Sequence, residues 1–306
     1  MFLRNLSFKF KIRDLKFCAR LFIFSAGVFL FPLLSTQGHT AELKTVLEVK
    51  QATDNYFHNK NWTPFAASIE LSFYKQDTLR STCTGTLLFD PLKKKLLMEC
   101  FGRLGQPVFV FRNDDLNFLL YLPGMRNAWQ GDMFQLEYSP EFDSHLKPLD
   151  LYRAVSPEAF SENQVIGAYG MSDGMELEIA KPYQGSSYLA RRIILDEHGQ
   201  VENETFLTPD GAETTVVVRE GFNKIKNKLD AVNSKFYYAP ETVVTHAETG
   251  DKTVLKMKNM TLHESFPDDA WVISMPEDVP LNPIEDGKPV FLTPEQAKDA
   301  HASQEA

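Results

Sequence analysis

The sequence predicts a mainly β protein with short helical parts, built on antiparallel sheet. Three observations predict this class. Residues 65–122 read as four or five consecutive strands joined by short turns, residues 175–262 hold further hairpins, and strands do not alternate with helices as they would in a parallel sheet. A chain of 306 residues has enough length for one large β-domain with a full core, and no internal repeat or second core is visible.

Residues 1–40 are predicted to be a signal peptide and no part of the fold. Six basic residues precede the uncharged run 21–34, and small and polar residues follow it at 35–41. This order of basic, apolar and small residues is typical of an export signal. The apolar run is shorter than the roughly 20 residues that span a bilayer, so we expect a cleaved, exported product. The alternative is an uncleaved N-terminal membrane anchor.

The net charge argues against binding of nucleic acid. The full chain carries a formal charge of −9, and residues 1–38 contribute six basic residues and one acidic residue, so the mature chain stands at −14. Such an acidic chain is not attracted to nucleic acid or to an anionic bilayer by bulk electrostatics.

An amphipathic helix is expected over residues 42–57, where apolar residues recur at helical spacing. It is suited to cover one face of the sheet. The strand that begins at Phe65 alternates apolar and polar residues with a period of two, which predicts one buried face.

The polarity of the next two strands predicts which of their residues face each other. With 90–93 as the loop, Phe89 faces Lys94 and Cys83 faces Cys100. One face then collects Cys83, Leu87, Leu96, Met98 and Cys100, and the other collects Thr84, Thr86, Lys95, Leu97 and Glu99. Because an exported chain meets an oxidising compartment, Cys83 and Cys100 are predicted to form a structural disulfide. The alternative is two buried free thiols.

The strands at 108–111 and 118–122 have no polar face. A strand of this kind either lies between two protein layers, or has one face on the core while the other lines an apolar cavity. The residues alone leave both readings open.

The rest of the chain predicts a lid, more hairpins and a tail. The strand pattern weakens over 125–170, which we interpret as an insertion or lid with helical pieces at 148–155 and from Ser156–Pro157. Further strands are expected at 175–180, 188–195, 201–207, 213–219, 241–247 and 253–262, an irregular closing segment at 263–281, and a mobile acidic tail at 282–306. The segment 222–232 fits either a helix or a loop.

No motif argues for an enzyme, a cofactor or a metal site. Residues 170–174 match G-x-S-x-G, but a nucleophile elbow needs a helix after its serine, and residues 175–179 alternate as a strand. Ser172 is therefore interpreted as part of a glycine-rich connection between strands. The histidines of the mature chain are scattered without metal-ligand spacing, and no phosphate-binding loop is present.

The C-terminal part of the chain resembles the LolA-like periplasmic lipoprotein carriers. In that family an alternating strand is followed by a loop, an aromatic-centred strand and Pro-x-x-Val, as at 250–262, 266–272 and 275–279 here. The N-terminal part is similar too, with an exported chain, a helix, a long strand, and a strand containing Gly85 that turns at Pro91.

The resemblance implies a curved antiparallel sheet over residues 41–281 that forms an unclosed half-barrel, with helices covering its concave side and an apolar cavity for acyl chains. The residues expected to line that cavity are Leu88, Leu97, Phe109, Phe111, Phe118 and Leu120. Carriers of this family also have an arginine near the first hairpin that latches the lid, where this chain has 93–95, three lysines.

The function implied by the resemblance is that of a periplasmic, non-enzymatic carrier or chaperone in outer-membrane lipoprotein sorting. Its partners would be an acylated protein or lipid, together with proteins of the inner or outer membrane. One alternative is a periplasmic sensor or adaptor of the same fold that binds exposed lipid or peptide and contacts a membrane partner. Another is a structural module whose strands are packed on both sides.

Overall fold

The structure is a computed structural model that describes residues 42–43, 46–59, 63–115, 117–133, 147–229, 235–285 and 288–289. The predicted signal peptide lies outside the described residues, and so does most of the predicted tail. The described helices are α1 (Val46–Asn59), α2 (Pro148–Val155) and the 3-10 turns η1 (Pro123–Met125), η3 (Glu162–Gln164) and η4 (Asp268–Trp271).

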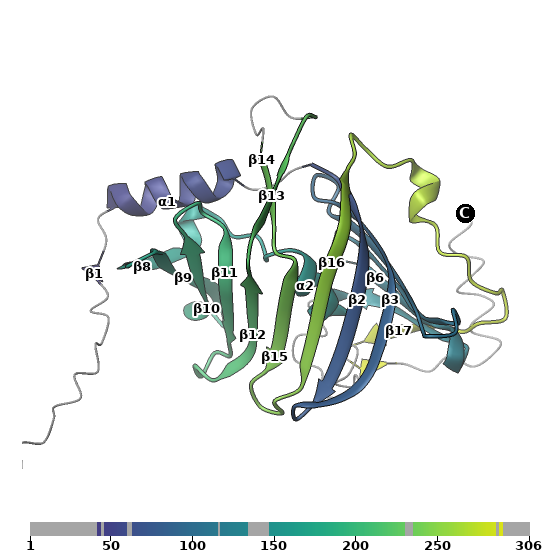
Figure 1. Ribbon diagram of the computed structural model, residues 1–306. Coiled ribbons are helices and arrows are strands. Elements are labelled where there is room, and N and C mark those ends of the chain that lie inside the picture. Colours follow the sequence, from purple (N-terminus) through teal and green to yellow (C-terminus); the bar gives the residue numbers. More distant parts are fainter. Residues whose placement is uncertain are drawn as a thin grey trace, which may run out of the picture. The chain divides into compact units, whose positions relative to one another are not determined.

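In the described part of the chain, sixteen strands form one curved sheet that does not close (Figure 1). Its order from edge to edge is β1-β8-β9-β10-β11-β12-β15-β16-β2-β3-β4-β5-β6-β7-β17-β18, and β13 and β14 form a separate pair. The strands of the first half are β1 (Glu42–Leu43), β2 (Phe65–Lys75), β3 (Thr78–Asp90), β4 (Lys95–Phe101), β5 (Pro107–Asp114), β6 (Asn117–Leu122), β7 (Asn127–Asp132), β8 (Val165–Met171) and β9 (Gly174–Tyr183). The strands of the second half are β10 (Ser186–Asp196), β11 (Val201–Leu207), β12 (Glu213–Glu220), β13 (Asn223–Lys226), β14 (Lys235–Tyr238), β15 (Glu241–His246), β16 (Lys252–Leu262), β17 (Leu281–Glu285) and β18 (Lys288–Pro289).

The mainly β class and the unclosed antiparallel half-barrel are confirmed, with one exception in the strand directions. β17 pairs with β7 in parallel, whereas every other described pair is antiparallel. Residues 282–285, which the sequence placed in the tail, therefore belong to the sheet, where Asn282 and Ile284 are buried. The ambiguous segment 222–232 contains a strand, because β13 pairs with β14.

The predicted register of β3 on β4 was wrong by two residues. Asp90 faces Lys95 and Leu88 faces Leu97, because the turn occupies 91–94. The Asp90 side chain fixes this turn by accepting hydrogen bonds from the backbone N–H groups of residues 92 and 93. A shift by two leaves every side chain on its predicted face. Cys83, Leu87, Leu96, Met98 and Cys100 accordingly all lie in the main core.

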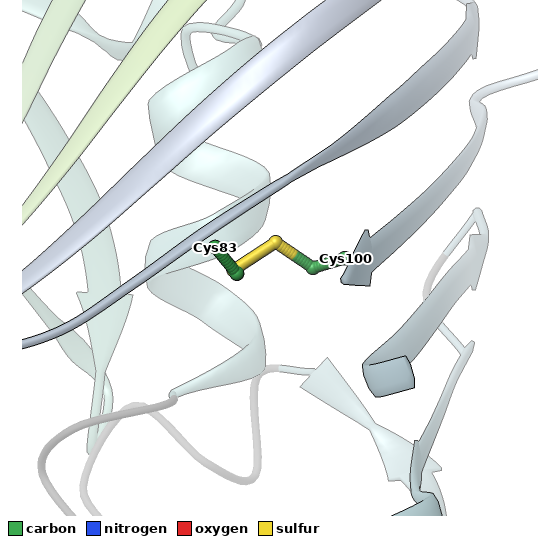
Figure 2. The surroundings of a disulfide bond; sticks show 2 residues. All are labelled: Cys83 and Cys100. Atoms are coloured by element: carbon green, nitrogen blue, oxygen red, sulfur yellow. A yellow bond between two sulfur atoms is a disulfide. The ribbon is translucent and has the colours of Figure 1, made fainter. Parts of the chain in front are cut away.

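The predicted disulfide is present, although the two cysteines are diagonal and not directly opposite. Gly85 faces Cys100 across the strand pair, and the Cys83–Cys100 bridge crosses beside it with a Cα–Cα distance of 5.7 Å (Figure 2). A Cβ atom on residue 85 would lie 1.7 Å from the carbonyl oxygen of Glu99. Glycine at 85 therefore allows β3 and β4 to approach each other closely beside the bridge.

Removing this bridge is expected to lower the free energy of unfolding by about 3 kcal/mol, because the bridge restricts the unfolded chain. The two cysteines are 17 residues apart. The change is Cys83→Ala with Cys100→Ala, and the measurement is urea unfolding. Reductant should destabilise the parent chain by a similar amount and leave the double variant unchanged. A loss below 1 kcal/mol would contradict this.

The strands with two apolar faces are covered on both sides. On the concave face, Phe109, Phe111, Phe118 and Leu120 pack in the main core, to which α2 contributes Leu149, Leu151 and Ala154. On the convex face, residues 266–281 of the closing segment pack against the outward side chains of β4 to β7. Phe266 and Trp271 lie there against Leu97, and Val279 lies against Tyr121. β5 and β6 thus lie between two protein layers.

The segment 125–170, predicted as an insertion or lid, contains one helix and two strands of the sheet in its described part. The predicted helix at 148–155 is confirmed as α2. The second helical piece, from Ser156–Pro157, was wrong: residues 157–161 form no helix, and the next helical turn is η3, which begins at Glu162. At the two ends of the segment, β7 and β8 are strands of the sheet. The N-terminal helix begins later than predicted, because residues 42–43 pair with β8 as β1.

Candidate functional site: a cavity on the concave face

A cavity of about 110 Å³ lies at one end of the concave face. Residues of α1, β2, β3, β11, β12, β14, β15 and β16 line it, together with residues 155–157 at the end of α2. Its lining residues are Tyr56, Phe65, Phe89, Pro91, Val155, Ser156, Pro157, Gly199, Gln200, Val201, Arg219, Phe222, Phe236, Tyr237, Tyr238, Ala239, Thr242 and Met257.

One side of the cavity is aromatic. The ring of Phe65 meets the ring of Phe236 edge-on at 5.6 Å and the ring of Phe89 at 5.5 Å. Phe236 is buried and comes from β14, where it pairs with Ile225 of β13. Among the described strands, β13 and β14 pair with each other and with no strand of the large sheet, and the contact between Phe236 and Phe65 packs this wall against β2.

The cavity lining also includes three buried polar side chains. Arg219 of β12 and Thr242 of β15 are paired residues on adjacent strands, and both line the cavity together with Gln200. In each of these three side chains a buried nitrogen or oxygen makes no hydrogen bond to any described residue: Nε of Arg219, Oγ1 of Thr242 and Nε2 of Gln200. Buried polar atoms are normally paired, so these three atoms are exceptions in the described structure.

Two buried arginines share one carboxylate. Glu204 has no exposed side-chain surface, and it lies 3.0 Å from Nη1 of Arg191 and 2.8 Å from Nη1 of Arg219. The three residues come from the neighbouring strands β10, β11 and β12. A buried carboxylate is tolerated at this position because two guanidinium groups compensate its charge.

The same two arginines hold the segment that covers the cavity. Arg219 donates from Nη2 to the carbonyl oxygen of Arg153 at 2.7 Å, and Arg191 donates from Nη1 to the carbonyl oxygen of Glu158 at 2.8 Å. The guanidinium of Arg153 in turn stacks 3.5 Å over the ring of Phe206. We call residues 147–160, which contain α2, the covering segment. These contacts tie the C-terminal half of that segment to the sheet.

Glu158 of the covering segment is itself an ion-pair partner. Its carboxylate lies 2.8 Å from Nζ of Lys181 and 3.6 Å from Nη2 of Arg153. Burial alone would raise the pKa of Glu158, but the charges of Arg191, Arg153 and Lys181 outweigh burial and hold that pKa at about 2. At the other end of α2, Asp150 lies 2.5 Å from Nε2 of His246. The covering segment is thus attached to the sheet by polar contacts near both ends.

The six residues predicted to line a cavity divide between two faces. Phe109, Phe111, Phe118 and Leu120 lie together in the main core of the concave face, and Leu88 and Leu97 lie on the convex face near Trp271. None of the six lines the cavity described above. The lysines at 93–95 do not reach the covering segment in the described contacts; Lys94 pairs with Asp115 and Lys95 with Asp114.

The sequence reasoning missed the buried charges, although a signal was present. Arg191 is in phase with the buried Ile193 in β10, and Arg219 is in phase with the buried Val217 in β12. A charged residue in phase with the inward apolar positions of a strand is unusual unless a partner is buried with it. Glu204, in phase with Phe206 of the intervening strand, is that partner.

The serine of the G-x-S-x-G match lies in a turn between two strands. Met171 pairs with Gly174, so Ser172 and Asp173 are the tip of the β8–β9 hairpin, as the strand pattern predicted. Among the described residues, no group of three or more His, Cys, Asp or Glu side chains could hold a metal ion. No helix in the described ranges is long and apolar enough to cross a membrane.

No family model matches the chain, and no curated protein matches it. Among solved structures, it is similar to a domain ascribed to outer membrane lipoprotein sorting from Vibrio parahaemolyticus, with a TM-score of 0.52 and 14% identity over 73% of this chain and 95% of that one. It is also similar to a LolA superfamily protein from Nitrosomonas europaea, with a TM-score of 0.51 and 11% identity over 74% and 97% of the two chains.

A third similar structure is a DUF1329 family protein from Desulfovibrio piger, with a TM-score of 0.52 and 10% identity over 73% of this chain and 97% of that one. At such identities the likeness concerns the fold alone. The LolA-like fold that the sequence predicted is confirmed by these three structures.

Proposed function

We propose that this chain, whose fold is LolA-like, is an exported, non-enzymatic carrier that shields the acyl chains of a lipoprotein or lipid from water between two membranes. The observation that carries the proposal is a partly aromatic cavity on the concave face, next to a short covering segment that polar contacts attach to the sheet. The likeness to a domain ascribed to lipoprotein sorting agrees with it. Proteins of the inner or outer membrane would be its donor and acceptor.

We infer from the cavity volume that a guest needs the covering segment to open. At about 110 Å³ it is smaller than the roughly 300–1,000 Å³ of typical ligand pockets. Leu149, Leu151 and Ala154 of α2 cover the adjoining concave surface. If α2 moves outward, an acyl chain can take the place of these side chains. Each Å² of apolar surface that the chain buries then contributes about 25 cal/mol, and no specific bond is needed.

The direct test is to purify the chain from cells with two membranes and to identify co-purifying lipids by mass spectrometry. We expect acyl species in stoichiometric amount, released by organic extraction. Binding of a fluorescent fatty-acid probe to the extracted protein is the second measurement. Recovery of no acyl species, together with no probe binding, would reject the carrier function.

Filling the cavity should block the guest without unfolding the protein. Ala239 is buried and lines the cavity directly after β14. Ala239→Phe is expected to weaken probe binding by about tenfold or more, while overpacking costs roughly 1–3 kcal/mol of stability. Ala212→Phe, in the exposed turn before β12, is the matched control and should bind the probe like the parent chain. Unchanged probe affinity in Ala239→Phe would place the guest elsewhere.

A further inference from the structure

The strand pair β13–β14 carries a group of lysines on a chain that is acidic overall. Figure 1 shows this pair projecting above β12 and β15. Over 221–238 the sequence holds four lysines and one aspartate, whereas the whole chain has a formal charge of −9. We call the described residues 223–229 and 235–238 the basic hairpin. Its lysines, all exposed, are Lys224, Lys226, Lys228 and Lys235.

The register of the basic hairpin places three of these lysines on one face. Lys224 faces Tyr237 and Lys226 faces Lys235, and directly opposed residues share a face. On this outer face Tyr237 is half-buried beside His198, and the lysines are exposed. The inner face packs in or against the main core with Ile225, Phe236 and Tyr238. The hairpin therefore has an apolar face on the protein and a basic face turned away from it.

The lysines of the basic hairpin lack the counter-ions that other lysines of this chain have. In the rest of the described structure, seven lysines contact carboxylates: Lys50, Lys94, Lys95, Lys181, Lys252, Lys256 and Lys258. None of the four hairpin lysines forms an ion pair with a described residue. Lys226 and Lys235 also lie directly opposite each other, and like charges in that position destabilise a strand pair. An anionic partner over this face would relieve the repulsion.

A buried asparagine fixes the end of β13 beside the cavity. Asn227 is 4% exposed, donates from Nδ2 to Oγ1 of Thr63 at 2.7 Å, and accepts from the backbone N–H of Leu229 at 3.0 Å. Thr63 comes two residues before Phe65, which lines the cavity. Next to the buried asparagine, Lys228 is exposed and Leu229 is 45% exposed. A lysine and an apolar side chain are thus presented together close to the cavity.

We propose that the outer face of the basic hairpin docks the chain on an anionic lipid surface. Proteins that bind such surfaces combine lysines for the headgroups with apolar side chains at the edge of the bilayer, as Lys228 and Leu229 offer here. The inner face of the same hairpin lines the cavity with Phe236 and Tyr238, so docking brings the cavity wall to the membrane. The inference rests on the proposed carrier function and names the surface at which a guest enters and leaves.

The acidity of the rest of the chain does not prevent this local attraction. At physiological ionic strength charges are screened over about 8 Å, so only the charges closest to the lipid headgroups contribute. Each lysine near an anionic surface then increases the affinity by about fivefold. The negative charge of the rest of the chain favours the orientation in which the basic hairpin points to the membrane.

The experiment is cosedimentation of the chain, purified from exporting cells and delipidated, with vesicles of phosphatidylcholine that contain or lack phosphatidylglycerol. The readout is the ratio of the two affinities, so any binding that does not depend on lipid charge cancels. We expect the parent chain to prefer the anionic vesicles by about a hundredfold, and high salt should abolish the preference.

Lysine variants locate the contact. The triple variant Lys224→Gln, Lys226→Gln and Lys235→Gln should lose nearly all of the preference, and Lys226→Gln alone should lose about fivefold. The comparison variant makes the same change of charge on β16, with Lys252→Gln, Lys256→Gln and Lys258→Gln. It should keep the preference, because these three lysines already pair with carboxylates of the protein.

The outcomes separate docking from carrying. If the parent chain binds both kinds of vesicle alike, the docking surface is wrong, an acidic protein becomes the expected partner of the lysines, and binding of the fatty-acid probe still supports the carrier function. A preference that survives in the hairpin variant, or that the β16 variant loses equally, also overturns the proposal. If the probe does not bind but the lysine-dependent preference is found, the carrier function fails and the docking surface stands.

Discussion

Glu204→Gln is expected to lower the free energy of unfolding by about 3–5 kcal/mol, the range found when one partner of a buried ion pair is removed. Glutamine has nearly the shape of glutamate but no charge. The substitution would leave Arg191 and Arg219 charged and buried, since Glu204 is the carboxylate that contacts both. Urea unfolding at neutral pH measures the loss.

Two comparisons show whether the loss comes from the uncompensated charges. Glu202→Gln, two residues away on the exposed side of β11, should change stability by no more than about 0.5 kcal/mol. Replacing Arg191, Glu204 and Arg219 together with methionine should recover a large part of the stability, because an apolar set of similar volume carries no unpaired charge. A loss below 1 kcal/mol in Glu204→Gln would show that the network contributes little.

Trp271→Ala should also cost about 3–5 kcal/mol, as is usual for a buried tryptophan. Trp271 is 4% exposed and packs in the convex cluster with Leu97, and its ring meets the ring of Phe266 edge-on at 5.5 Å. Its loss would leave part of the apolar convex face of β4 and β5 uncovered. Urea unfolding and binding of an environment-sensitive dye such as anilinonaphthalene sulfonate measure the two effects.

The adjacent Val272→Ala is the control, because Val272 is 67% exposed and its truncation should change stability by less than about 0.5 kcal/mol. If Trp271→Ala lost under 1 kcal/mol and bound no additional dye, the closing segment would not be a packed layer. The doubly apolar strands would then need another explanation.

The sequence predicted which face of a strand each side chain lies on better than it predicted the register between paired strands. Each face of β3 and β4 was assigned from polarity, and that assignment survives a register error of two residues because side chains alternate with a period of two. The register itself depends on the turn at 91–94, where Asp90 is the last strand residue and not the first loop residue. The disulfide was predicted because the register placed the two cysteines opposite each other and because export leads to an oxidising compartment.

The position of the cavity could not be predicted from the sequence. The strands 108–111 and 118–122 pointed to a surplus of apolar surface, but the closing segment covers their convex side and α2 packs into the core on their concave side. Nothing in the irregular pattern of 263–281 indicates which face of the sheet it covers. The cavity depends instead on the β13–β14 pair and the covering segment, which meet Phe65 and Phe89 at positions far away in the sequence.

The contacts that hold the covering segment could not be predicted from the sequence either. The carriers that the sequence resembles have a latching arginine near the first hairpin, where this chain has lysines at 93–95. In this chain the arginines that bond the covering segment come from β10 and β12. Both arginines stand on inward positions of their strands, and their partners in the covering segment are more than 30 residues away in the sequence, so no local pattern indicated these contacts.

The most direct test of the central claim is photocrosslinking of the purified chain with a long-chain fatty acid that carries a diazirine near its terminal carbon, followed by peptide mass spectrometry. The account predicts crosslinks to residues 236–239 of the aromatic side and to 155–157 of the covering segment, and unlabelled fatty acid should suppress them. Labelling confined to the convex face around Trp271, or labelling that excess unlabelled fatty acid does not reduce, would contradict it.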